Sequence, residues 1–350
     1  MAALVGRAFR AGLAEGTRAS YTKGVKRLAR FGLQLGLVQD GLLLEPSELD
    51  LMYWVVAMGH VEKLSPSYIA QLLSGVQNAF LEWGMKSPLK DDRGVPLPAL
   101  HRVLRGIKRE LTKPRKDRLP ITTPILKQLL ERLHSGRPGK LGENYLCYRA
   151  MLTLGVYGLL RQGEMTSLTT TKWNPLLQAA RSAVRFEKDD DGNISSMVFT
   201  CVASKCDPFR LTVDIVIHAT GTKDCPVKAM QRYLASRKRS KKPEPLFTHT
   251  DGTFVTRGRL VSCMMALLQE CGFPQTKYST HSLRIGGCVS LAAAGFGREV
   301  IAIYGRWKSD SLLLYLQLGR ATLCEATVGM AQVTMEMVEG RGKDGLRRDA

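Results

Sequence analysis

Apolar positions recur at helical spacing through roughly the first hundred residues of the chain. One stretch carries Tyr21, Val25, Leu28 and Phe31 at intervals of three or four residues, which is typical of a helix with a single apolar face. Thr17 precedes this stretch and is the predicted N-cap, because its hydroxyl can accept a hydrogen bond from an unpaired N–H of the first turn. The other faces of this helix are basic and could meet phosphate.

A second helix is predicted to begin at Ser65 or Ser67 and to end at Gly84, since glycine suits the left-handed conformation that closes many helices. Its apolar face consists of Ile69, Leu72, Leu73, Val76 and Phe80. Together these patterns indicate a small all-helical N-terminal domain.

Beyond Pro120 the pattern changes to helices interrupted by one patch rich in β-branched residues. Residues 196–201 and 211–217 flank a polar turn at 203–208 and therefore predict a β-hairpin, with a further turn before it at 189–192. The expected fold is mainly α with a small β-sheet in the second domain.

Residues 102–118, between these two parts, carry eight basic side chains and two acidic ones, and Pro114 and Pro120 bracket a linker. The run predicts either a solvated helix face followed by a hinge or a surface that tracks a DNA backbone. The expected organisation is a helical domain at 1–112, a basic linker at 113–120, a second domain at 121–338 and a disordered tail at 339–350.

The chain of 350 residues has a net charge of +20 and a pI near 9.8. Such an excess predicts a polyanionic partner, with nucleic acid favoured over an anionic membrane, because basic side chains release the counterions held by phosphates. The longest apolar stretch, 150–160, is shorter than the roughly 20 residues that span a bilayer. The basic residues expected to contact DNA are Arg18, Lys23, Lys26, Arg105, Lys108, Arg109, Lys113, Arg115 and Lys116.

Candidate chemistry gathers near the C-terminus, in T-H-S-L-R-I-G-G, then G-R-W, then a tyrosine in an apolar run. His281 and Arg284 are three residues apart, so they lie on one helical face. Tyr315 could attack a phosphate only beside positive charge and proton-transfer groups, since the ordinary pKa of tyrosine is about 10. Alternatively, Trp307 and Tyr315 are core aromatics and His281 is a core histidine.

Two upstream residues can complete such a site. Arg161 follows an apolar run and has Glu164 three residues later, where the carboxylate can lie beside the guanidinium; the alternative is an ordinary surface ion pair. Lys205 is expected at the hairpin tip, either as a solvated turn residue or as a general acid that approaches the leaving oxygen when DNA is bound.

Taken together, the order Arg161, Lys205, His281, Arg284, Trp307, Tyr315 resembles the catalytic series of the tyrosine recombinase, or phage-type integrase, superfamily. The resemblance covers nearly the whole chain. It is closest to recombinases of Crypton and DIRS-type mobile elements, on the motifs L-L-R-Q-G-E, S-K-C-D-P-F-R, D-C-P-V-K-A, H-S-L-R-I-G-G and G-R-W-K-S-D.

The resemblance implies a helical SAM-like core-binding domain and an α+β catalytic domain that form a C-shaped DNA clamp. It implies a DNA strand-breaking and rejoining enzyme that works through a 3′-phosphotyrosyl intermediate, without metal or other cofactor. Three alternatives remain: a catalytically inactive DNA-binding protein derived from a recombinase, a type IB topoisomerase-like enzyme, and a phosphatase or other small-substrate enzyme, which the charge excess disfavours. The implied roles are nucleophile for Tyr315, proton transfer for His281 and Lys205, phosphate binding for Arg161, Arg284 and Trp307, and support of Arg161 for Glu164.

Two positions depart from the broader family. Trp307 stands where many phage integrases have histidine, and an indole donates one hydrogen bond but cannot shuttle a proton. Tyr315 follows Trp307 by eight residues, one fewer than is common in phage integrases, although this spacing suits the Crypton and DIRS-type pattern.

The expected partner is double-stranded DNA, bound by a homotetramer on paired sites, for the mobilisation of a transposable element. Residues 321–338 are amphipathic and predict either a segment exchanged between subunits or a closing helix of the same chain. The basic cluster at 237–243 predicts either a nuclear localisation signal or a solvated loop near DNA phosphate, and a eukaryotic chain would act in the nucleus. Eight cysteines without C-x-x-C spacing disfavour a zinc site and favour a reducing compartment.

Overall fold

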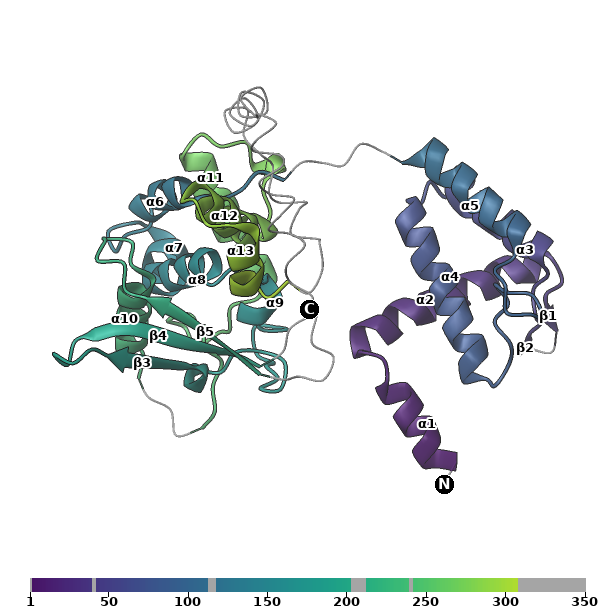
Figure 1. Ribbon diagram of the computed structural model, residues 1–350, viewed down its shortest axis with the longest axis horizontal. Coiled ribbons are helices and arrows are strands. Elements are labelled where there is room, and N and C mark those ends of the chain that lie inside the picture. Colours follow the sequence, from purple (N-terminus) through teal and green to yellow (C-terminus); the bar gives the residue numbers. More distant parts are fainter. Residues whose placement is uncertain (1, 40–41, 113–117, 203–211, 239–241, 308–350) are drawn as a thin grey trace, which may run out of the picture. The chain divides into compact units, whose positions relative to one another are not determined.

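The computed structural model describes residues 2–39, 42–112, 118–202, 212–238 and 242–307 (Figure 1). The chain divides into two compact units, Met1–Arg115 and Lys116–Ala350. The first unit contains α1 (Ala2–Ala11), α2 (Glu15–Gln34), β1 (Val38–Gln39), β2 (Leu42–Leu43), α3 (Glu48–Val56) with a π-helical turn (Ala57–Val61), α4 (Pro66–Glu82) and α5 (Pro98–Leu111).

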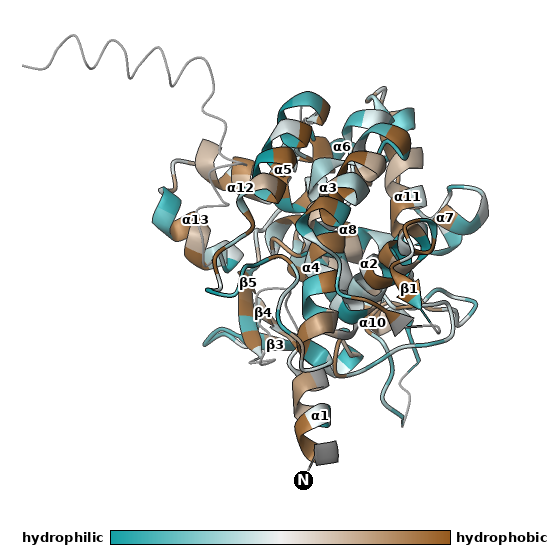
Figure 2. Ribbon diagram, turned by 90° about the vertical axis from the view of Figure 1, so that its right-hand side faces the viewer, coloured by the Kyte–Doolittle hydropathy of each residue, from teal (hydrophilic) through white to brown (hydrophobic). Residues whose placement is uncertain are grey.

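The helices of the first unit each bury one face in a shared core, and brown and teal patches alternate along α4 and α5 in Figure 2. The prediction for α4 is confirmed: Ser65 is its N-cap, accepting a hydrogen bond from the N–H of Tyr68 at 3.4 Å, and the predicted apolar face is buried. The prediction that Thr17 caps α2 is wrong. The helix begins at Glu15, because the carbonyl of Ala14 already accepts bonds from the next turn.

The second unit surrounds α8, whose residues are buried on almost every side. Because nearly all faces of this helix are buried, its sequence is a continuous apolar run and not an amphipathic pattern. The elements of the unit are α6 (Thr123–Glu131), α7 (Gly139–Glu143), α8 (Tyr145–Tyr157), α9 (Gln162–Met165), a 3-10 turn (Arg181–Ala183), β3 (Val184–Lys188), β4 (Ile194–Cys201), β5 (Val213–His218), α10 (Pro226–Ser236), α11 (Arg257–Glu270), a 3-10 turn (Gln275–Lys277), α12 (His281–Ala293) and α13 (Arg298–Gly305).

The predicted hairpin is present as β4 and β5, which pair antiparallel from Ser196 opposite His218 to Cys201 opposite Val213. A third strand, β3, was not predicted and pairs antiparallel with the other side of β4. Its sequence, VRFEK, lies at the sheet edge with mostly exposed side chains, so it lacks a strong apolar signal. The fold class is confirmed as mainly α with a small sheet in the second unit.

Candidate active site

The turn after α8 places the first predicted site residues. Arg161 occupies the N-cap position of α9, and its N–H donates to the carboxylate of Glu164 at 2.9 Å. The Arg161 guanidinium donates to the same carboxylate at 3.2 Å. The pairing expected from their spacing therefore exists, but through a capping turn rather than along a helix face. Glu164 is 5% exposed, so this carboxylate is buried and ion-paired.

The helix α12 places Arg284 against the same turn. The residue is 1% exposed, and its guanidinium donates to the backbone carbonyls of Leu159 and Gly305. The Trp307 ring lies over the guanidinium, with its centroid 3.9 Å from Cζ, a stacking distance for a cation on an aromatic face. Gly305 makes room for this ring, because a Cβ there would lie 1.5 Å from Cζ3 of the indole. Trp307 is therefore neither a surface residue nor a member of the main core.

Arg306 also enters this cluster, although no role was predicted for it. It ends α13 in the left-handed conformation, with φ of 60° and ψ of 42°. One terminal nitrogen of its guanidinium donates to the carbonyl of Leu159 and to the carboxylate of Glu164, each at 3.3 Å. The sequence does not predict this contact, because Arg306 is one of many basic residues in the chain.

Charge accumulates where these segments meet. Burial, followed by the positive charges of Arg161 and Arg306, lowers the pKa of Arg284 to about 10. Three guanidiniums thus surround one buried carboxylate, that of Glu164. This cluster, termed the arginine cluster below, has an excess of positive charge and is chemically suited to an anion.

His281 is the first residue of α12 and is partly exposed, one helical turn before Arg284. The hydroxyl of the preceding residue, Thr280, donates to the side chain of Gln162, which follows Arg161 in the chain. This bond ties the start of α12 to the turn that carries Arg161. His281 therefore stands at the accessible margin of the arginine cluster, a suitable position for a proton-transfer group.

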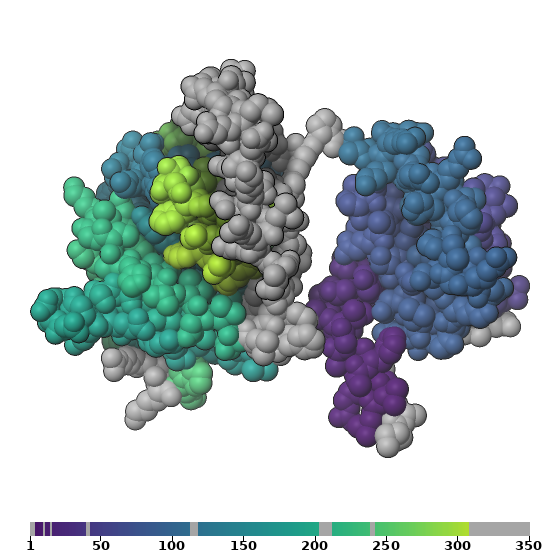
Figure 3. Space-filling view, in the orientation of Figure 1, coloured from purple at the N-terminus to yellow at the C-terminus, as the bar shows by residue number. Residues whose placement is uncertain are grey.

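Two predicted catalytic residues, Lys205 and Tyr315, lie outside the described residues, as do Lys113, Arg115, Lys116 and residues 321–350. In the sequence, Lys205 falls between β4 and β5. Trp307 is the last described residue before Tyr315. The helix α13 that precedes it lies at the surface of the second unit, where its yellow-green atoms appear in Figure 3.

The basic residues predicted to contact DNA in the first unit are mostly exposed. Lys23 and Lys26 are exposed on α2, and Arg105, Lys108 and Arg109 are exposed on α5. The α5 helix buries Leu100 and Ile107 on its opposite side, so its basic face is free of the core. Arg18 is only partly exposed.

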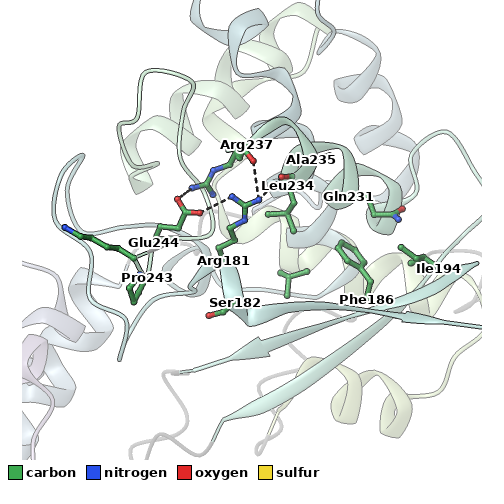
Figure 4. A pocket seen from close by; sticks show the side chains of 12 residues that line it. Arg181, Ser182, Phe186, Ile194, Gln231, Leu234, Ala235, Arg237, Pro243 and Glu244 are labelled. Carbon is green, nitrogen blue, oxygen red and sulfur yellow. Dashed lines mark hydrogen bonds and ion pairs between the residues drawn. The ribbon is translucent and has the colours of Figure 1, made fainter. Parts of the chain in front are cut away.

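The first residue of the basic cluster at 237–243 is largely buried and does not fit the solvated-loop alternative. Arg237 and Arg181 both pair with Glu244, at 2.7 and 3.0 Å, beside a cavity of about 850 Å³ between β3 and α10 (Figure 4). Arg237 also donates to the carbonyl of Leu246 at 2.6 Å. Because these bonds use its guanidinium to hold the chain after α10, Arg237 is a structural residue. Lys238 and Lys242 remain exposed.

Within the described part of the chain, no group of three or more His, Cys, Asp or Glu side chains is arranged to hold a metal ion. The helices of that part include none long and apolar enough to cross a membrane.

No protein-family model matches the chain, and no curated protein matches its sequence. Solved structures do match it. The post-cleavage complex of the XerH site-specific recombinase with a palindromic difH substrate superposes with a TM-score of 0.59 at 12% identity, covering 88% of this chain and 78% of that one. The Tn1549 transposon integrase in complex with circular intermediate DNA gives 0.51 at 16% identity, with coverage of 91% and 94%.

A lambda integrase dimer bound to a COC′ core site also gives a TM-score of 0.51, at 13% identity and with coverage of 91% and 96%. The chain therefore has the fold of the tyrosine recombinases and integrases. At these identities the likeness establishes the fold, while the chemistry must be argued from the site residues.

Proposed function

We propose that this protein is a site-specific DNA recombinase that cleaves and rejoins DNA through a tyrosine. The observation that carries the proposal is the convergence of Arg161, Arg284 and Trp307 in one positively charged cluster. The sequence motifs predict these three residues, and more than a hundred residues separate Arg161 from the other two. If Arg161 belonged to an ordinary surface ion pair and Trp307 were an ordinary core aromatic, nothing would require the three residues to lie together.

The arginine cluster supplies what phosphodiester cleavage requires. Negative charge grows on the non-bridging oxygens as phosphorus becomes five-coordinate, and fixed guanidiniums stabilise that charge without reorganisation. Arg161 and Arg284 act as these guanidiniums, while the Glu164 carboxylate orients Arg161. The stacked Trp307 ring fixes Arg284 and adds an apolar wall.

Tyr315 is the proposed nucleophile, attacking phosphorus while His281 assists removal of its phenolic proton. Lys205 protonates the departing 5′ oxygen. The products are a 3′-phosphotyrosyl bond and a free 5′ hydroxyl, and attack by a 5′ hydroxyl of a second strand reverses the step. Because the covalent bond conserves the energy of the broken phosphodiester, rejoining needs no ATP.

The biological setting follows from the same proposal. Recombination joins two sites, so the working assembly is a homotetramer on paired duplexes, with residues 321–338 as the exchanged segment. The resemblance of its motifs to those of Crypton and DIRS-type recombinases supports the mobilisation of a transposable element in a nucleus.

The decisive test is covalent trapping on DNA. Purified protein is incubated with labelled duplexes that span the ends of the genetic element encoding the chain, and is then denatured. The wild type is expected to leave labelled DNA on the protein, and Tyr315→Phe is expected to bind DNA without leaving any. Tyr304→Phe is the matched control, because the Tyr304 hydroxyl donates to the carbonyl of Tyr157 at 2.7 Å and is thereby engaged in the fold.

Each other outcome has a distinct meaning. An undiminished adduct in Tyr315→Phe refutes the choice of nucleophile. DNA binding by the wild type without any adduct favours an inactive DNA-binding descendant. Relaxation of a supercoiled plasmid that lacks a second site favours a type IB topoisomerase-like activity.

A further inference from the structure

The backbone at Arg306 is unusual for its residue type. Its φ of 60° lies in the left-handed region, which at the end of a helix is normally given to glycine. The left-handed backbone costs more conformational free energy for an arginine than for a glycine. Glycine would therefore give a more stable turn if the turn were the sole requirement at this position. The side chain must therefore offer something that offsets the unfavourable backbone.

The donors of Arg306 are only partly used. One terminal nitrogen contacts the carbonyl of Leu159 and the carboxylate of Glu164, at 3.3 Å each. The other two nitrogens, Nε and Nη1, are buried and have no hydrogen-bond partner among the described residues. By contrast, both terminal nitrogens of Arg284 donate to backbone carbonyls. Buried N–H groups are seldom left unpaired, so a site with two of them points to an absent acceptor.

A purely structural role explains these contacts poorly. The Glu164 carboxylate already accepts two bonds from Arg161, at 2.9 and 3.2 Å, and does not depend on Arg306 for partners. A structural ion pair would also turn both terminal nitrogens toward the carboxylate, as Arg137 does toward Glu270. Arg306 instead adds a third positive charge to a cluster that contains a single carboxylate, and that charge contributes to lowering the pKa of Arg284.

We infer that Arg306 is a third phosphate-binding arginine, whose unpaired Nε or Nη1 group donates to a non-bridging oxygen of the DNA phosphate held by Arg161 and Arg284. A guanidinium holds its N–H donors in a fixed plane and is weakly hydrated, which suits it to bind phosphate. The assignment of the ligand as a DNA phosphate rests on the proposed function, whereas the anion site rests on the arginine cluster alone.

The test compares Arg306→Gly with the wild type. Glycine removes the guanidinium and suits the left-handed backbone, so a loss of activity cannot come from a weakened turn. Arg306→Gln gives a second variant that keeps a side chain. Arg232→Gln is the control for a lost positive charge, since Arg232 is exposed on α10 and lies outside the cluster.

Two readouts separate this inference from the proposed function. The first is the affinity of the full chain for inorganic phosphate, measured by the rise of the unfolding temperature. The second is the rate of covalent adduct formation on DNA. Both are expected to fall about 10- to 100-fold in Arg306→Gly and Arg306→Gln, the range of one hydrogen bond to a charged group. Arg232→Gln is expected to keep wild-type values.

A DNA substrate with a methylphosphonate at the cleaved position supplies the sharpest discrimination, because it lacks one negatively charged oxygen. If Arg306 neutralises that charge, the rates of adduct formation by Arg306→Gly and by the wild type differ by only a few-fold on this substrate. A structural role of Arg306 leaves the ratio of the two rates unchanged, and that result overturns the inference. Equal phosphate affinity in the two proteins overturns it too. A wild type that forms no adduct, but loses phosphate affinity on Arg306→Gly, contradicts the proposed function and leaves the anion site standing.

Discussion

Replacing Glu164 by glutamine removes the carboxylate that pairs with Arg161 and Arg306 without changing the size of the side chain. In the present structure this carboxylate accepts bonds from Arg161 and Arg306, and the Glu164 side chain is only 4% exposed. An amide oxygen can still accept hydrogen bonds, but it no longer offsets the positive charges of the cluster. Glu164→Gln should therefore destabilise the second unit in the absence of ligand.

The size of the effect follows from burial. Removing one partner of a fully buried ion pair costs about 3–5 kcal/mol. Because the side chains of Arg161 and Arg306 are 21% and 12% exposed, water screens part of the lost attraction, and we expect about 2–3 kcal/mol. For a unit of this size 1 kcal/mol shifts the unfolding temperature by about 2–4 °C, so the expected loss is roughly 4–12 °C.

Thermal unfolding of the full chain checks this value against Glu270→Gln. Glu270 also pairs with an arginine, Arg137, but its side chain is 39% exposed, so its loss should lower the unfolding temperature by less than about 4 °C. Inorganic phosphate should restore Glu164→Gln more than the wild type, since an added anion replaces the missing charge. Equal losses in the two variants, or no selective rescue by phosphate, would refute the reasoning.

Two further predictions concern the fold that holds the site. Gly286→Ala should abolish stable folding, because its Cβ would lie 1.8 Å from the carbonyl oxygen of Ile121; Gly258→Ala, with nothing nearer than 3.9 Å, should leave thermal unfolding unchanged or slightly improved. Burial and then the charge of Arg259 lower the pKa of His249 below its ordinary 6.5, so the folded state takes up this proton less readily than the unfolded one. The contribution of neutral His249 to the free energy of unfolding is complete above about pH 6.5 and declines as the pH falls toward the folded-state pKa. In urea titrations at pH 7.5 and 5.5, His249→Gln should therefore lose less of its free energy of unfolding between the two pH values than the wild type does.

The fold was predictable from sequence wherever local signals agreed with packing. At α4, a serine cap and an apolar stripe point to the same helix, and the structure has it. The hairpin of β4 and β5 carried a β-branched pattern on both strands. By contrast, β3 is a charged edge strand that is recognisable only beside its partner, and the true start of α2 depends on the carbonyl of Ala14 rather than on a capping side chain.

The arginine cluster could be predicted only in part from the sequence. The sequence motifs predict a site role for Arg161, Arg284 and Trp307, because their order along the chain resembles the catalytic series of the recombinases. They do not predict one for Arg306, because in a chain with 51 lysines and arginines one more arginine carries no signal. Its only local hint was the preceding Gly305, whose missing side chain accommodates the Trp307 ring.

The atom that joins the cluster is a backbone oxygen, which has no sequence signature. The carbonyl of Leu159 accepts from both Arg284 and Arg306, and Leu159 itself has a φ of 47°, left-handed although it is not glycine. Two non-glycine residues in this conformation, Leu159 and Arg306, thus meet at one hydrogen bond. Such conformations persist only where surrounding contacts enforce them. The burial of Leu159 and the guanidinium contacts supply that enforcement, so the arginine cluster exists only once the turn after α8 and the end of α13 have packed together.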